Sequence, residues 1–99
     1  MLDKIYAINE ALEQRFPDGN SIFEIMTRLL EECGELAEQV NIFEDRGIKR
    51  QKHGQPDQAK LAKEVQDVLR CALAVARHYG IEAELEASVE KSYQGLRER

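Results

Sequence analysis

Two stretches of the chain share one layout of apolar and acidic residues, and this repetition constrains the fold more than any other feature. The first, residues 29–40, reads LLEECGELAEQV, and the second, residues 61–72, reads LAKEVQDVLRCA. When the leucines that open the two stretches are aligned, acidic residues coincide twice: Glu32 with Glu64, and Glu35 with Asp67. Apolar residues three and four apart, with no internal proline, predict that both stretches are helical.

Within each stretch the two carboxylates are three residues apart, so they lie on one face of the predicted helix, at the rim of its apolar stripe. If the two stripes pack together, all four carboxylates converge. Like charges about 4 Å apart near a protein surface repel by roughly 4 kcal/mol, which a small domain tolerates poorly without a counter-ion. Carboxylate oxygens are the ligands that Mg²⁺ and Mn²⁺ accept. We therefore predict a divalent-cation site at Glu32, Glu35, Glu64 and Asp67.

Composition limits the classes of function. The 99 residues, 42% of them hydrophobic, suffice for one domain spanning 1–99 with a small core. A net charge of −5 argues against nucleic acid as a partner, because the cationic footprint is missing. The apolar runs are too short for a signal peptide or a membrane span, so no membrane partner is expected. Cys33 and Cys71 lack metal-site spacing and are expected to be reduced core residues of a cytoplasmic protein.

The chain predicts an all-α fold of four helices. The expected helices are 2–15, 22–44, 58–79 and 82–97, separated by the turn FPDGN at 16–20, a polar connection at 45–56 and Gly80. Ser21 and Glu24 form a capping box, in which both side chains are expected to serve free backbone amides, and Asp57 caps the third helix.

The apolar seams predict which faces are buried. On the first helix the expected face is Leu2, Ile5, Ile8 and Leu12. The second helix has the seam Ile22, Met26, Leu29, Cys33, Leu36, Val40 and Phe43, and the third has Leu61, Val65, Val68, Leu69, Ala72, Val75, Ala76 and Tyr79. The first and fourth helices are too short or too thinly apolar to cover both seams. We therefore expect a four-helix bundle completed by homo-oligomerisation.

The connection at 45–56 holds the one dense cationic run of this acidic chain. Lys49 and Arg50 lie at its centre, between the two acid-bearing helices. Such a run is typical of a solvated loop, but its position also favours a role in holding phosphate oxygens.

The acidic motifs resemble those of a known family. Glu31-Glu32-Cys-Gly-Glu35, followed after a loop by Glu64-Val-Gln-Asp67, is similar to the EExxE…ExxD signature of the MazG-like all-α nucleoside triphosphate pyrophosphohydrolases. The similarity covers roughly residues 22–79. A single EExxE is weak, since glutamate is common in helices, but its combination with ExxD on a second helix is specific.

The resemblance implies hydrolysis of a nucleoside triphosphate between its α- and β-phosphates, with house-cleaning of the nucleotide pool as the expected role. The family's ligands correspond to Glu32, Glu35, Glu64 and Asp67, which would hold Mg²⁺ or Mn²⁺. The cation would neutralise phosphate charge and orient or deprotonate an attacking water. The resemblance also implies a homodimer or a dimer of dimers. Residues near the cluster that are expected to position water or a second cation are Glu31 and Glu38. Lys91, in a partial match to a C-terminal family motif that lacks its asparagine, is an expected phosphate contact.

Two other classes of protein fit parts of the pattern. A di-iron carboxylate bundle requires Glu-x-x-His pairs, and neither His53 nor His78 has a glutamate three residues before it, so iron chemistry is disfavoured. A non-enzymatic helical dimerisation module, with its acids facing solvent, stays open as the alternative to the enzyme. The two differ in their response to Mg²⁺, to which such a module is indifferent.

Overall fold

The computed structural model describes residues 1–44 and 55–98. In these two ranges it has four α-helices and no strand: α1 (Leu2–Arg15), α2 (Ile22–Phe43), α4 (Gln58–Tyr79) and α5 (Glu82–Arg97). The prediction of an all-α fold is thereby confirmed, and the helices begin and end within one residue of the expected positions. No helix in the described ranges is long and apolar enough to cross a membrane.

The helix ends follow from local sequence. The Asp57 side chain accepts hydrogen bonds from the amides of Ala59 and Lys60, and Gly80 closes α4 in the left-handed conformation, at φ 65°. At the start of α2, Ser21 Oγ accepts from the Glu24 amide at 3.2 Å, as expected. The expected partner of the Glu24 carboxylate differs, however. It accepts the Ser21 hydroxyl proton at 2.8 Å and so holds the capping serine in place.

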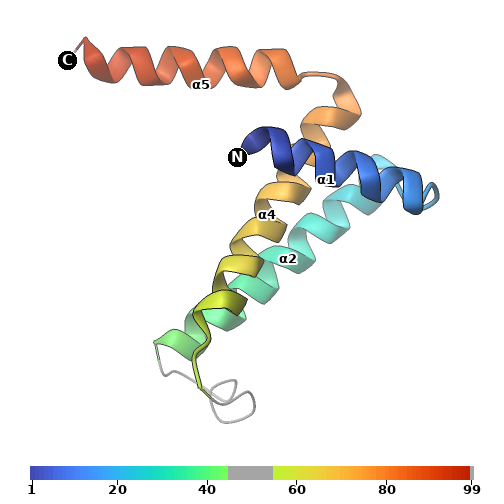
Figure 1. The fold of residues 1–99 in the computed structure, drawn as a ribbon, viewed down its shortest axis with the longest axis vertical. Coiled ribbons are helices and arrows are strands. Elements are labelled where there is room, and N and C mark those ends of the chain that lie inside the picture. Colours follow the sequence, from blue (N-terminus) through green and yellow to red (C-terminus); the bar gives the residue numbers. More distant parts are fainter. Residues whose placement is uncertain (45–54, 99) are drawn as a thin grey trace.

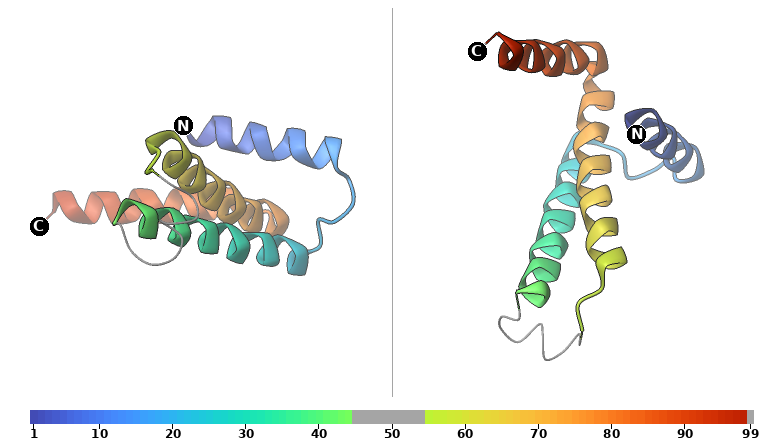
Figure 2. Two further views of the ribbon diagram at one scale, coloured as in Figure 1. Left: turned by 90° about the horizontal axis from the view of Figure 1, so that it is seen from below. Right: turned by 60° about the vertical axis from the view of Figure 1, so that its left-hand side comes forward.

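Helix α4 is the central element (Figures 1 and 2). Helix α2 runs antiparallel along one side of α4, α1 packs on another side, and α5 contacts α4 alone among the described helices. Helix α5 projects away from the other three (Figure 1). A single chain therefore does not close into a bundle by itself, and completion of the expected four-helix bundle by homo-oligomerisation stays a prediction.

The buried face of α1 is rotated from the predicted one. Ile5 and Asn9 are buried, whereas Ile8 is 39% exposed. The reason is a polar contact: Asn9 Nδ2 donates to the backbone oxygen of Arg70 at 3.0 Å, which places the asparagine against α4. Hydrophobic spacing alone could not predict this, because it ignores a polar group that finds a partner inside.

The predicted seam of α2 is only partly buried. The helix buries Ile25 and Ile42 against its neighbours, whereas Met26, Cys33 and Val40 are exposed. The prediction that Cys33 is a core residue is therefore wrong, while Cys71 is buried as expected. The cause is that α2 turns its acid-bearing face toward α4, which leaves much of the apolar seam outside.

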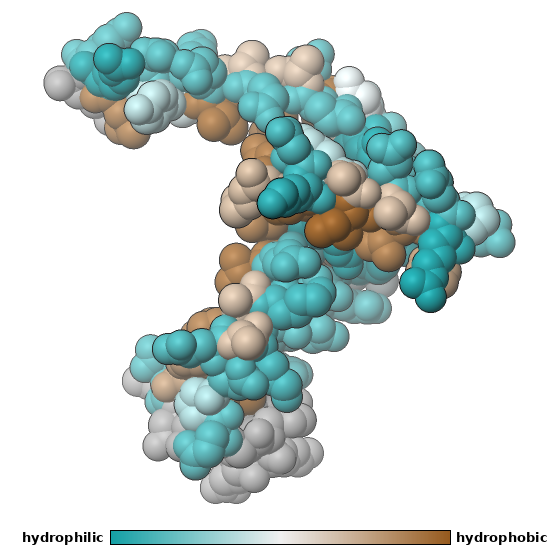
Figure 3. Space-filling model, viewed as in Figure 1, coloured by the Kyte–Doolittle hydropathy of each residue, from teal (hydrophilic) through white to brown (hydrophobic). Residues whose placement is uncertain are grey.

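Helix α4 shows the same rotation. It buries Cys71, Leu73 and Ala76, whereas four residues of its predicted seam are exposed: Val65, Leu69, Ala72 and Tyr79. Figure 3 shows hydrophobic surface along one edge of the helix pair and on the underside of α5, inside the angle that the two make. Apolar surface of this extent is typical of a face that contacts another molecule.

Candidate active site between helices α2 and α4

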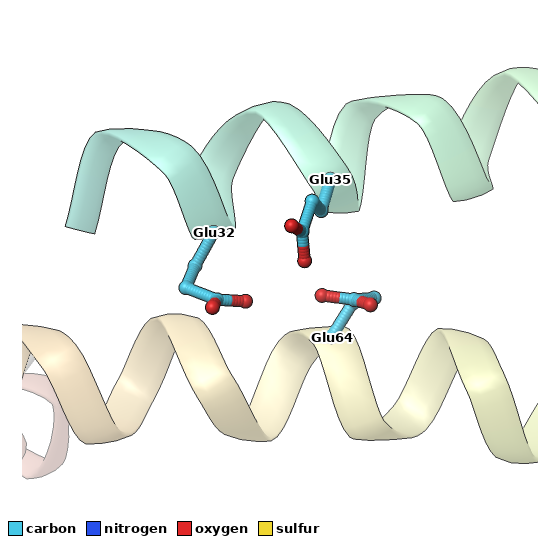
Figure 4. A group of neighbouring side chains, drawn as sticks. All are labelled: Glu32, Glu35 and Glu64. Carbon is cyan, nitrogen blue, oxygen red and sulfur yellow. The ribbon is translucent and has the colours of Figure 1, made fainter. Parts of the chain in front are cut away.

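Three carboxylates from two helices meet between α2 and α4. Glu32 and Glu35 project from α2, Glu64 projects from α4, and all three side chains point toward one another (Figure 4). One carboxylate oxygen from each lies within 4.8 Å of the others. The antiparallel packing of α2 on α4 brings the two repeated motifs opposite each other, as the doubled pattern predicted.

The cluster is electrostatically unfavourable without a cation. Glu32 Oε2 and Glu64 Oε2 are both buried without a hydrogen-bond partner among the described residues. Burial, together with the neighbouring charges of Glu35, Asp67 and Glu64, raises the pKa of Glu32 to about 7. Burial and the charge of Glu35 also raise the pKa of Glu64. Proteins tolerate converging acids of this kind at sites where the perturbed carboxylates do chemical work.

The donor set fits a hard divalent cation. Three carboxylates supply anionic oxygens from two helices, and two carboxylate oxygens of the cluster are buried without a partner in the part of the chain that the structure describes. Mg²⁺ and Mn²⁺ prefer such oxygens and complete their coordination with water or phosphate oxygens. Glu35 is exposed, so the cluster opens to solvent on one side, from which a phosphorylated ligand can approach.

Asp67, the fourth predicted ligand, is not part of this group of three. Its Oδ1 lies 2.6 Å from Lys63 Nζ and 3.9 Å from Arg70 Nε, so the carboxylate is turned toward cations of its own helix. It is nevertheless near enough to raise the pKa values of both Glu32 and Glu64. A side-chain rotation would be needed to bring Asp67 into the cluster.

The remaining predicted site residues are more distant or fall outside the described ranges. Glu31 is exposed on α2, and Glu38 is partly buried further along the same helix. Lys91 is exposed on α5, which leaves the far end of α4, about 22 Å along that helix from Glu64 at 1.5 Å per residue. Lys49 and Arg50 lie outside the described residues.

A cavity that sequence reasoning missed lies beside the cluster, between α1, the turn after it, α2 and α4. Its volume is about 260 Å³. The residues that line it include Asn9, Phe16, Ile25, Arg28, Arg70 and Cys71. The sequence does contain a signal for a role of Asn9, because it is a polar residue on the same helical face as Ile5.

The chain matches the family model of the MazG nucleotide pyrophosphohydrolase domain over residues 21–99. It belongs to this family, and the resemblance drawn from the acidic motifs is confirmed. No curated protein and no solved structure matches the chain. The match begins at the residue that caps α2 and includes both acidic motifs, whereas α1 and the turn after it precede the matched region.

Proposed function

We propose that this protein hydrolyses a nucleoside triphosphate between the α- and β-phosphates, releasing a nucleoside monophosphate and pyrophosphate. The observation that carries the proposal is the convergence of Glu32, Glu35 and Glu64 within 4.8 Å, in a chain of the nucleotide pyrophosphohydrolase family. House-cleaning of the nucleotide pool is the role we propose for this reaction.

Each residue of the site has a proposed part. Glu32, Glu35 and Glu64 would hold Mg²⁺ or Mn²⁺, and Asp67 would join them after exchanging Lys63 for the cation. A bound cation would supply neutralisation of phosphate charge and a more acidic water. Other residues keep the parts predicted from sequence: Glu31 and Glu38 would position water, and Lys49, Arg50 and Lys91 would contact phosphate oxygens.

The proposal includes a homodimer or a dimer of dimers. Exposed apolar residues follow one stripe along α2, at the helical spacing of Met26, Leu30, Cys33, Ala37 and Val40. A second copy would cover this stripe. It would also bring a second set of residues near the site, which is how Lys91 could reach phosphate despite its distance within one chain.

We also propose that residues 1–99 act as one domain, in a cytoplasmic protein. Helix α1 lies outside the family match, yet it is joined to α4 by the bond from Asn9 to Arg70 and by an ion pair between Arg77 Nε and Glu13 Oε2 at 2.7 Å. These contacts support a common unit. The two cysteines in the described residues are unpaired, which supports a reducing compartment.

A non-enzymatic dimerisation module is the second candidate, because the exposed apolar stripe on α2 fits it equally well. The carboxylates separate the two candidates. A module without chemistry has no need to bury two carboxylate oxygens without partners, which is destabilising.

The test of the proposed function is product analysis with Mg²⁺ in ¹⁸O-labelled water. We expect pyrophosphate and a nucleoside monophosphate, with the label in the monophosphate, because water attacks the α-phosphorus. Release of orthophosphate and a diphosphate would contradict the proposal. So would the absence of hydrolysis across canonical and modified nucleoside triphosphates, which would favour the dimerisation module.

A further inference from the structure

The cavity lies along the α2–α4 interface from the acidic cluster, as the spacing of its lining residues indicates. Ile25 precedes Glu32 by seven residues on α2, and Cys71 follows Glu64 by seven on α4. Seven residues are about two helical turns, so each cavity residue lies on the same face as its glutamate, roughly 10 Å along the helix. Because the two helices run antiparallel (Figure 1), both displacements lead toward the same end of the α2–α4 interface. A ligand held by its phosphates at the cluster can therefore extend into the cavity.

The arginines that line the cavity are engaged with other groups of the protein. Arg77 pairs with Glu13 at 2.7 Å. Arg28 donates to the backbone oxygen of Gly19 at 2.7 Å and to Asn20 Oδ1 at 3.1 Å, which fixes the turn that forms one wall. The remaining arginine leans toward Asp67, at 3.9 Å. With these cations engaged, the cavity suits an uncharged ring better than a phosphate group.

The volume and the lining of the cavity also suit an uncharged ring. The volume of about 260 Å³ lies just below the range of roughly 300–1,000 Å³ typical of drug-sized ligands, so the cavity suits one part of a nucleotide better than the whole. Apolar side chains cover part of its wall, among them Leu12, Ile25 and Ala74. Flat apolar rings are held well against such surfaces.

Asn9 gives the cavity one oriented polar group. The residue is 4% exposed and lines the cavity. Its Nδ2 donates to the backbone oxygen of Arg70 at 3.0 Å, and this bond fixes which way the carboxamide faces. Its Oδ1 receives no hydrogen bond from the described residues. A fixed acceptor without a protein donor selects ligands that carry an N–H or O–H at that point.

We propose that the cavity holds the base of the nucleotide and that Asn9 determines which bases are accepted. The inference depends on the proposed function, since it places the base relative to phosphates at the cluster. Asn9 Oδ1 would accept a hydrogen bond from an exocyclic amino group, as on cytosine or adenine. A base with a carbonyl oxygen at that position, such as uracil or hypoxanthine, would set two acceptors against each other and be disfavoured.

The test compares kcat/KM for pyrophosphate release within two pairs of triphosphates matched in sugar: cytidine against uridine, and adenosine against inosine. We expect the wild type to prefer the amino member of at least one pair by about tenfold, the size of one good hydrogen bond. Asn9→Leu, similar in shape but without an acceptor, should reduce the ratio to near one. Asn9→Asp keeps an acceptor but loses the Nδ2–H that donates to the Arg70 backbone oxygen and fixes its direction, so it should also reduce the ratio.

One control variant and one substitute variant complete the test. Asn41→Leu alters an exposed asparagine near the end of α2 and should leave the wild-type ratio intact. Where Asn9→Leu does not fold, as judged by circular dichroism, Asn9→Ala takes its place. Equal kcat/KM for the two members of each pair, in an active wild type, overturns the inference and leaves the proposed function standing. A preference for the amino member that persists in Asn9→Leu does the same. Release of pyrophosphate from none of the four by the wild type overturns the inference, and its absence from every canonical and modified nucleoside triphosphate overturns the proposed function as well.

Discussion

Glu32 and Glu64 face each other across the α2–α4 interface (Figure 4), and each buries one carboxylate oxygen that has no hydrogen-bond partner within residues 1–44 and 55–98. Facing carboxylates repel, and buried unpartnered oxygens lose their hydration, so the pair destabilises the metal-free fold. A divalent cation would remove both costs. The acidic pair therefore links the stability of the protein to its metal site.

Mg²⁺ or Mn²⁺ should raise the melting temperature. A ligand bound by the folded state alone adds about 2.7 kcal/mol of stability at 100 times its dissociation constant. Differential scanning calorimetry with and without millimolar metal measures the shift. Glu64→Gln should remove most of it, while Glu84→Gln, at an exposed position on α5, should leave it unchanged. A melting temperature that metal does not alter would contradict a preformed site.

The metal-free protein should lose stability as pH rises from about 4.5 to about 7. Burial and the adjacent carboxylates raise the pKa of Glu32 from 4.5 to about 7. The folded state therefore binds this proton more tightly than the unfolded chain, and the resulting stabilisation fades across that window. Metal must displace the proton, so metal affinity should increase over the same range and then level off. Melting in chelator and Mn²⁺ titration, each from pH 5 to 8, measure the two effects. Glu32→Gln should flatten both curves, and a pH-independent wild type would contradict the assignment.

Lys63→Gln should strengthen metal binding by a few-fold. Lys63 Nζ holds Asp67 Oδ1 at 2.6 Å, but the lysine side chain is 60% exposed, and such pairs contribute only about 0–1 kcal/mol. Its removal frees Asp67 to rotate toward the cluster. Calorimetric titration with Mn²⁺ measures the change. Weaker binding in Lys63→Gln would mean that the lysine positions Asp67 for the metal instead of competing for it.

Leu30→Glu should dissociate the proposed oligomer. Leu30 is 67% exposed on the apolar stripe of α2, and a charge there would be buried in an interface between copies. Sedimentation velocity at micromolar concentration should show an oligomeric wild type and a monomeric variant. Gln14→Glu, which adds the same charge at an exposed position on α1, should sediment like the wild type. A well-folded monomeric wild type would refute the oligomer.

The helices and the meeting of the two acidic motifs followed from sequence because both depend on local periodicity. Glu32 and Glu64 share one phase relative to their leucines, so antiparallel packing of the two helices on this side brings them together wherever the axial register sets the two motifs opposite each other. Capping residues such as Asp57 likewise predicted correctly where the helices begin. Helical periodicity fixes the face of the helix on which a residue lies, so these features could be predicted from sequence.

The buried faces were predicted less well, because an apolar stripe does not say what covers it. Met26 and Val40 lie on the strongest stripe of α2, yet both are exposed in the single chain, whereas Glu32 is partly buried. The hydrogen bond from Asn9 to the backbone of α4 likewise puts Asn9 on the buried face of α1, and Ile8 is exposed. The cavity forms where α1, the turn after it, α2 and α4 meet. Neither its volume nor its lining could therefore be predicted from one helix at a time.

The most direct test of a catalytic role for the carboxylates is the turnover number for pyrophosphate release in Glu35→Gln and Glu64→Gln, with Glu84→Gln as control. Both site variants keep the side-chain shape and should stay folded, with metal-free melting temperatures at or above that of the wild type. We predict that each loses about a thousandfold in turnover, which corresponds to roughly 4 kcal/mol of transition-state stabilisation, while the control keeps wild-type activity. Wild-type turnover in both Glu35→Gln and Glu64→Gln would contradict the assignment of this site.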